Sequence, residues 1–261
     1  ISDCSPFILS IVECNLAAVN LFIDYYGSDI VNQTEQVNYA LKQLLAKVCH
    51  SNIQNNNNYT SLIQVIKRLS EVVNVNLNVY CDYDTFLTLA VKKSLLDLVK
   101  LLLQIDSVDV NLCDLFTGNS PFLIAITHFK EEIISLFFDC PRTDFNYSNY
   151  DNETALTFSL QKPGNTTYLP KLIEKTDDKH IDYAFYLSDD TTAPLFTSHP
   201  NLNVNFIPVK PIEFPQLKYI NYNRHRANEP PITIDSCESS LMTSIRLSCF
   251  NKAFLIINHP S

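Results

Sequence analysis

The chain has 261 residues, and its 46% hydrophobic and 18% charged content supports a packed core and excludes wholesale disorder. Its net charge of −9 disfavours nucleic acid or an anionic membrane surface as a partner, because either needs a clustered basic face, which the sequence lacks. The sequence contains no run of about eighteen apolar residues, so no transmembrane helix is expected.

Two helix pairs are predicted in the first part of the chain. The first pair occupies 5–11 and 16–23, and the second joins a helix at 36–49 to a helix at 59–72. In each helix the apolar residues recur at helical spacing. Residues 55–58 are four asparagines, and we predict a loop there because asparagine side chains compete with a helix for its backbone hydrogen bonds.

The stretch 84–111 contains the most regular helix pair. Apolar residues recur at helical spacing in its first part, Ser94 interrupts the run, and a second, wider apolar face follows. Thr85 is predicted to cap the first helix, because its hydroxyl can accept a hydrogen bond from an otherwise unpaired first-turn N–H group. The Asp-Val-Asn sequence at 109–111 favours a turn that ends the pair.

The following stretch repeats this pattern. Residues 120–126 correspond to the first helix and 132–138 to the second. The capping positions Thr85, Ser120 and Thr154 are separated by about 35 and about 34 residues. A shared period for caps, helices and closing turns predicts a helical repeat protein.

Both stretches resemble the ankyrin repeat, in which T-P-L-H-L-A-A, a small break and an L-E-I-V-K-L-L-L helix precede a D-V-N ending. Residues 84–111 depart from that pattern at Phe86, where the family has proline, and at Ser94, where it has glycine. The resemblance implies an all-α, ankyrin-like helical repeat solenoid, since one helix pair cannot bury its apolar face without stacking on its neighbours.

The rest of the chain continues the array with interruptions. A further repeat opens with a helix at 153–160, and Pro170 should bend its second helix unless it falls in that helix's first turn. An irregular sixth repeat is expected at 180–199. Residues 206–236 lose the helical periodicity and contain several prolines, which predicts one long irregular insertion. The helical pattern resumes at 241–257.

We therefore predict a single array over 1–261 that is irregular in its second and sixth repeats. The predicted repeats are 1–32, 33–78, 79–113, 114–148, 149–178 and 179–205, followed by the insertion at 206–236 and a final partial repeat at 237–261.

The resemblance also implies a function, namely a scaffold that binds a partner protein through loop tips and the concave surface of the first helices. The candidate partner-binding residues at the tips are Tyr83, Asp84, Leu115, Phe116, Asn119, Tyr150, Asn152 and Glu153. Those that close the first helices are Lys92, Lys93, Thr127 and His128, with Val12 and Glu13 in the first repeat. Exposed aromatic tips suit binding, because they offer a large contact area at low entropy cost. The alternative is that these rings pack between neighbouring loops and that the two lysines form a merely solvated face.

Two other functions are compatible with parts of the sequence. The chain could be a non-catalytic targeting or spacer arm of a larger multidomain protein. It could instead be an enzyme whose site lies in the insertion, with His225, Asp235, Cys237 and Glu238 as nucleophile and base. No catalytic motif supports the enzyme, the three glycines stand alone, and the histidines are dispersed. We therefore expect no enzymatic activity, cofactor, metal or small-molecule substrate.

The eight cysteines form no C-x-x-C pair and lie far apart along the chain. A small disulfide scaffold would show closely spaced cysteines in a short chain. This usage favours free thiols and a cytoplasmic protein.

Overall fold

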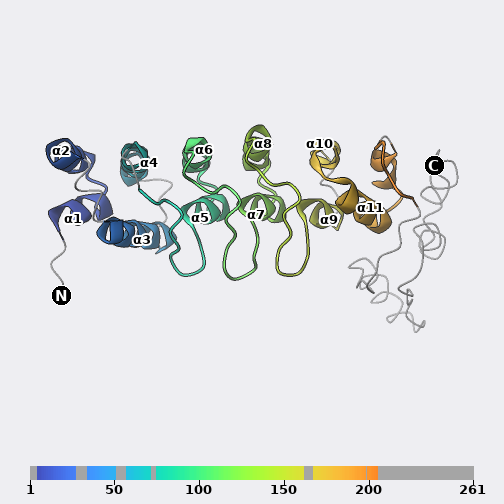
Figure 1. The fold of residues 1–261 in the computed structure, drawn as a ribbon, viewed down its shortest axis with the longest axis horizontal. Helices are drawn as coiled ribbons and strands as arrows, with labels where there is room; N and C mark the ends of the chain where they lie inside the picture. The colour runs from blue at the N-terminus through green and yellow to red at the C-terminus, as the bar shows by residue number, and fades with distance from the viewer. Residues whose placement is uncertain are drawn as a thin grey trace. The chain divides into compact units, whose positions relative to one another are not determined.

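Figure 1 shows the computed structural model, which describes residues 5–27, 34–50, 57–71, 75–161, 167–197 and 199–204. In these residues the regular elements are helices, which confirms the predicted all-α class. They belong to two compact units. The first consists of Ile1–Asp144 and Ser148–Asp151, and the second of Phe145–Tyr147 and Asn152–Ser261. The insertion and the final partial repeat lie outside the described residues, and the single continuous array with its repeat boundaries stays a prediction.

The first unit contains four helix pairs. Its helices are α1 (Pro6–Val12), α2 (Leu16–Tyr26), α3 (Thr34–His50), α4 (Asn57–Ser70), α5 (Phe86–Lys92), α6 (Leu96–Gln104), α7 (Pro121–Thr127) and α8 (Glu131–Asp139). The first helices α1, α3, α5 and α7 form one row, and the second helices α2, α4, α6 and α8 form another (Figure 1). Contacts join α5 to α7 and α6 to α8, so the pairs within 84–111 and 119–146 are adjacent helical hairpins, as the repeat prediction requires.

The first helices are the inner layer of the core. Every residue of α5 from Phe86 to Val91 is buried, and α7 is equally buried from Pro121 to Ile126. The second helices are amphipathic: α6 buries Leu98, Val99 and Leu102 and exposes Lys100. A helix of seven residues is too short to be stable alone, so this burial between neighbours is what maintains it.

A threonine cap starts α5, as predicted. The Thr88 N–H donates to the Thr85 hydroxyl at 3.1 Å, and the Thr85 N–H donates to the Thr88 hydroxyl at 2.8 Å. Both threonines are buried, so this reciprocal capping box satisfies donors that water does not reach. In the second unit, Thr154 and Thr157 form the same box at the start of α9.

The described turns that join α1 to α2, α5 to α6 and α7 to α8 each contain a left-handed residue. Ser94 has φ +57° at this position, and Cys14 and Phe129 have +52° and +54° at the corresponding positions. The turn is closed by the Leu95 N–H, which donates to the Ala90 carbonyl at 2.9 Å. The chain therefore keeps the backbone that a glycine would adopt without cost, although it places three different side chains there.

We predict that Ser94→Gly stabilises the protein by about 0.5–1 kcal/mol. Relief of a left-handed conformation is worth about 1–2 kcal/mol, and the extra freedom of glycine in the unfolded chain offsets about 0.5–1 kcal/mol of it. The midpoint of urea unfolding should rise accordingly. Ser94→Ala, which keeps the Cβ atom, should show no such gain, and an equal rise in both variants would contradict this explanation.

Three asparagines, each at the end of a closing turn, join neighbouring repeats. The Asn111 side chain donates to the Arg142 carbonyl and accepts from the Asp144 N–H, both at 2.8 Å. Asn78 makes the equivalent two bonds one repeat earlier, at 2.9 and 2.8 Å. In the second unit, Asn146 accepts a backbone bond of the same kind at 2.9 Å. An amide is suited to this place because it is donor and acceptor at once.

Asn111→Ala should destabilise the protein by about 1–3 kcal/mol, because it removes both bonds and leaves two backbone groups of the next repeat without their partner. Urea or thermal unfolding measures the loss. Asn76→Ala is a matched control, since the exposed Asn76 side chain accepts only a local bond from the Asn78 N–H. Equal losses in the two variants would show that the bond between repeats has no special role.

The second unit contains α9 (Ala155–Leu160), α10 (Leu169–Lys175), α11 (Asp178–Leu187) and the 3₁₀-helix η3 (Ala193–Phe196). α9 packs against α10 and α11, and η3 packs against α10 and α11. Pro170 lies in the first turn of α10, where its missing N–H has no partner to lose, so it does not bend the helix.

One loop prediction was partly wrong. Residues 55–58 were expected to form a loop, but α4 begins at Asn57, so its first two residues are asparagines. First-turn N–H groups have no partner within a helix, and a residue with poor helix propensity therefore costs little there.

Candidate functional site

The loops that connect one repeat to the next project beyond the row of first helices, on the side away from the second helices (Figure 1). Two successive loops bring Tyr83 and Phe116 together. Their rings meet edge to face with centroids 5.9 Å apart, and the Leu115 N–H donates to the Tyr83 carbonyl at 2.9 Å. The rings remain 58% and 75% exposed, so they touch each other and still face solvent.

Tyr150 extends this set from the following loop. Its side chain is 61% exposed, and its N–H donates to the Thr117 carbonyl at 3.4 Å. Its ring covers Gly118, where a Cβ atom would lie 2.6 Å from the ring, and Gly118 has φ +70°. Only glycine satisfies both constraints. We name Tyr83, Leu115, Phe116 and Tyr150 the tip row.

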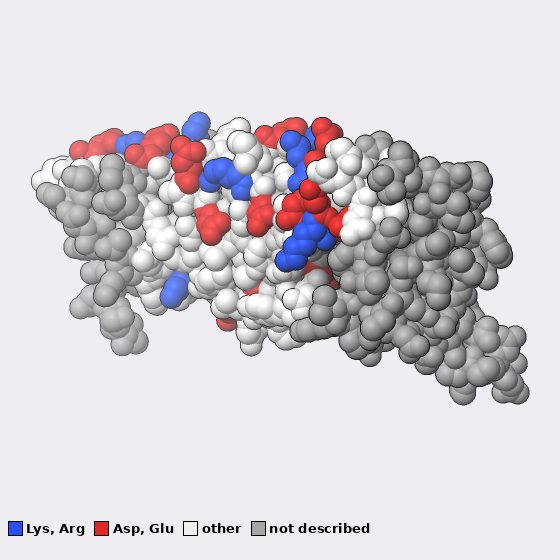
Figure 2. Space-filling view, turned by 45° about the vertical axis from the view of Figure 1, so that its right-hand side comes forward, with Lys and Arg blue, Asp and Glu red and all other residues white. Residues whose placement is uncertain are grey.

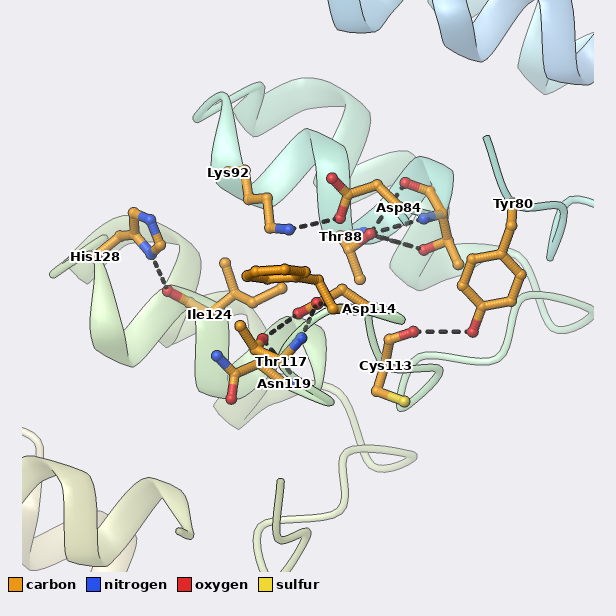
Figure 3. Close-up of polar contacts among 12 residues, drawn as sticks. Tyr80, Asp84, Thr88, Lys92, Cys113, Asp114, Thr117, Asn119, Ile124 and His128 are labelled. Atoms are coloured by element: carbon orange, nitrogen blue, oxygen red, sulfur yellow. Dashed lines mark hydrogen bonds and ion pairs between the residues drawn. The ribbon is translucent and has the colours of Figure 1, made fainter. Parts of the chain in front are cut away.

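Asp114 holds the loop that carries two tip-row residues (Figure 3). Its buried carboxylate accepts hydrogen bonds from the Phe116 N–H at 3.0 Å and from the N–H and hydroxyl of Thr117, both at 2.7 Å. Burial alone would raise the pKa of Asp114. The bonds from Thr117, the positive charge of Lys92 and the bond from Phe116 outweigh that effect and lower the pKa. The loop is therefore fixed by an ionised side chain.

Asp114→Asn should destabilise the protein by about 1–2 kcal/mol at neutral pH, since charge-assisted bonds become neutral ones. The lowered folded-state pKa makes this contribution complete above the unfolded-state value near 4, and it is lost as pH falls through the folded-state value. Urea midpoints of the two proteins should therefore converge on acidification. The exposed Asp106 supplies the control, because Asp106→Asn should lower the urea midpoint little at any pH. If the difference in urea midpoint between Asp114→Asn and the parent protein stayed constant as the pH falls, that result would contradict the role assigned to Asp114.

Several predicted binding residues make contacts within the first unit (Figure 3). The Asp84 carboxylate pairs with the Lys92 ammonium at 2.7 Å, and both side chains are at most one-third exposed. Asp84 also exchanges backbone bonds of 3.0 and 3.1 Å with Cys81, which closes the turn at Tyr83. Lys93 is half-buried at the end of α5. These groups position the tips more than they extend from them.

Asn119, Thr127 and His128 form hydrogen bonds within the first unit. Asn119 accepts from the Asn149 side chain at 2.8 Å, and the Thr127 hydroxyl donates to the Ile124 carbonyl at 2.9 Å. His128 Nδ1 lies 3.0 Å from the same Ile124 carbonyl, a bond that requires a proton on Nδ1. Thr127 and His128 therefore close α7, whereas Asn119 joins its own loop to the next one just before α7 begins.

Of the remaining predicted residues, Asn152 and Glu153 belong to the second unit, and Val12 and Glu13 belong to the first repeat. Asn152 is exposed with φ +59°, and the Glu153 carboxylate accepts from Gln161 at 3.4 Å. In the first repeat, Lys47 donates to the Val12 carbonyl and pairs with Glu13 at 2.8 Å.

Sequence reasoning missed the supporting residues of the tip row. Asp114 and Gly118 determine the loop conformation, and the Tyr80 hydroxyl donates to the Cys113 carbonyl at 2.8 Å, which joins two loops. The signal for the first two was present: an aspartate shortly before a Thr-Gly pair is a typical turn sequence.

Other features of the described residues serve structure. They contain no group of three or more His, Cys, Asp or Glu residues that could hold a metal ion, and none of their helices is long and apolar enough to cross a membrane. A cavity of about 520 Å³ lies where α6 and α8 end. Arg142 lines it, but its guanidinium donates to four backbone carbonyls at 2.6–3.1 Å and so caps the end of α6. Residues 206–238, which contain the candidate catalytic groups, lie outside the described ranges.

Comparison with known proteins gives a likeness of fold alone. No protein-family model matches the sequence, and no curated protein matches it either. A similar solved structure is the ankyrin repeat domain of Bcl-3, described as a unique member of the IkappaB protein family; it covers 67% of this chain and 88% of that chain, with 18% sequence identity and a TM-score of 0.43. The ankyrin-like assignment made here rests on this chain's own repeats: stacked hairpins with threonine or serine caps, left-handed turns and projecting loops.

Proposed function

We propose that this chain is a non-catalytic protein-interaction module, and that the tip row of the first unit is its contact surface. The observation that supports the proposal is the exposure of four large apolar side chains, between 47% and 75%, on adjacent loops. Apolar side chains gathered on one surface indicate an interaction site, and aromatic residues supply most hot spots in protein interfaces.

The fixed loops strengthen this proposal. Asp114 holds one tip, the Cys81–Asp84 turn holds the other, and the Leu115 N–H joins them. A surface that is already ordered loses little conformational entropy when it binds, so more of the contact energy appears as affinity. The ion pair of Asp84 and Lys92 is already satisfied, so we assign these two residues a supporting role.

The competing functions predict different behaviour. A targeting or spacer arm would not require the tip row for any contact. An enzyme with its site at 206–238 would depend on His225 or Cys237 and not on the tips. A cytoplasmic location and the absence of cofactors remain parts of the proposal.

Site-specific photo-crosslinking tests the proposal. A benzoyl-phenylalanine at position 116 should crosslink a defined protein in cell extract, whereas the same group at position 25 should not. Tyr25 is a suitable control because it is aromatic, 81% exposed and part of α2, which lies in the row of second helices away from the projecting loops (Figure 1). Mass spectrometry identifies the crosslinked protein.

Purified partner then gives the quantitative test. Tyr83→Ala and Phe116→Ala together should weaken its binding at least about tenfold, because hot-spot aromatics each contribute on the order of 1–2 kcal/mol. Tyr25→Ala should leave the affinity unchanged. Retained affinity in the double variant, with an unfolding midpoint equal to that of the parent, would rule out the tip row as the contact surface.

A further inference from the structure

The charges on the tip loops all have one sign. Residues 79–85, 113–120 and 148–151 contain four aspartates and no lysine or arginine. Two of these carboxylates are already used, since Asp84 pairs with Lys92 and Asp114 caps its own turn. The other two, Asp82 and Asp151, are exposed.

These two carboxylates are adjacent in sequence to tip-row rings. Asp82 precedes Tyr83, and Asp151 follows Tyr150. Neither forms an ion pair with another residue in the described part of the chain. Figure 2 shows one face of the molecule, on which acidic and basic side chains are interspersed and most of them lie in the upper half of the view. The tips therefore combine exposed aromatic rings with two exposed carboxylates that are not held in an ion pair, although the Lys42 ammonium lies near enough to the first loop to act on Cys81.

This combination of groups has a specific complement. A cation over the face of an aromatic ring is attracted by the ring quadrupole, and arginine is the commonest protein cation in that position. The guanidinium also binds carboxylates through two parallel hydrogen bonds while its flat face stacks on a ring. Leu115, 47% exposed and next to Phe116 in sequence, adds an apolar contact.

We infer that the partner presents a basic, arginine-containing segment to the tip row. Arginine side chains of that segment stack on Tyr83, Phe116 or Tyr150 and bind Asp82 or Asp151, and a neighbouring apolar side chain covers Leu115. The net charge of −9 on the whole chain favours the same partner by attracting it from a distance. This inference rests on the proposed function and specifies its partner class.

Selection from a library of short random peptides on phage tests the inference without a known partner. The full chain is the target, and the Tyr83→Ala, Phe116→Ala variant is the counter-target that removes peptides bound elsewhere. We expect the retained peptides to be enriched in arginine beside an apolar residue. Their binding, measured by fluorescence anisotropy, should weaken as salt rises from about 0.05 M to about 0.5 M, because exposed charge pairs are screened.

Two matched double variants, each of which removes two negative charges, test whether Asp82 and Asp151 bind the selected peptides. Asp82→Asn with Asp151→Asn should weaken the selected peptides about threefold to tenfold, as expected for two exposed charge pairs. Asp97→Asn with Asp106→Asn changes the net charge equally at two exposed residues at the ends of α6, and it should leave binding nearly unchanged.

The other outcomes separate the two proposals. Tip-dependent peptides that are neutral or acidic would overturn the basic partner and leave the tip row as the contact surface. Equal loss in the two asparagine pairs would show a general charge effect and overturn the role of Asp82 and Asp151. Failure to enrich any tip-dependent peptide would count against both proposals.

Discussion

Burial of the first helices between their neighbours is the constraint on which the first unit depends. Helix α5 has seven residues, and all of those from Phe86 to Val91 are buried. Such a helix has no polar face to turn toward water and too few hydrogen bonds to persist alone. Its apolar surface is satisfied only when α6 and α7 cover it, so each repeat takes its stability from the next one.

Short buried helices create many unpaired backbone groups, and much of the polar side-chain content serves to satisfy them. Thr85 and Thr88 cap one helix start, Asn111 binds the next repeat, and Arg142 covers the carbonyls where α6 ends. Buried backbone groups without a partner are costly, which explains why these residues occupy such regular places. A consequence is that the loops between repeats are held firmly at both ends.

The loops use their charged and aromatic residues differently. Asp114 is buried and ionised beneath one tip, and the Asp84–Lys92 pair lies at the base of the other. The aromatic rings of Tyr83 and Phe116 are left outside, in contact with each other and with solvent. A recognition surface needs a rigid backbone and large exposed apolar side chains, and these loops have both. The function proposed here follows from that combination.

The sequence by itself determined the features that depend on nearby residues. The period of about 34 residues, the paired helices and the Thr85 cap could be predicted because helix faces and caps involve residues three or four positions apart. The start of α4 could not, because asparagines that favour a loop are also tolerated in the first turn of a helix, where the N–H groups have no partner within the helix. The left-handed turn at Ser94 also escaped prediction, because only the closing of one helix onto the next imposes it.

Only the tertiary structure decided which candidate residues form a common surface. Tyr83 and Phe116 are about one repeat apart in sequence, and their rings meet because the repeats stack in register. The same stacking places Tyr150 over Gly118, whereas Asp84 and Lys92 form an ion pair beneath the tips. Sequence spacing specifies each repeat, but contacts between repeats depend on the distances that packing sets, and those distances separate binding residues from supporting ones.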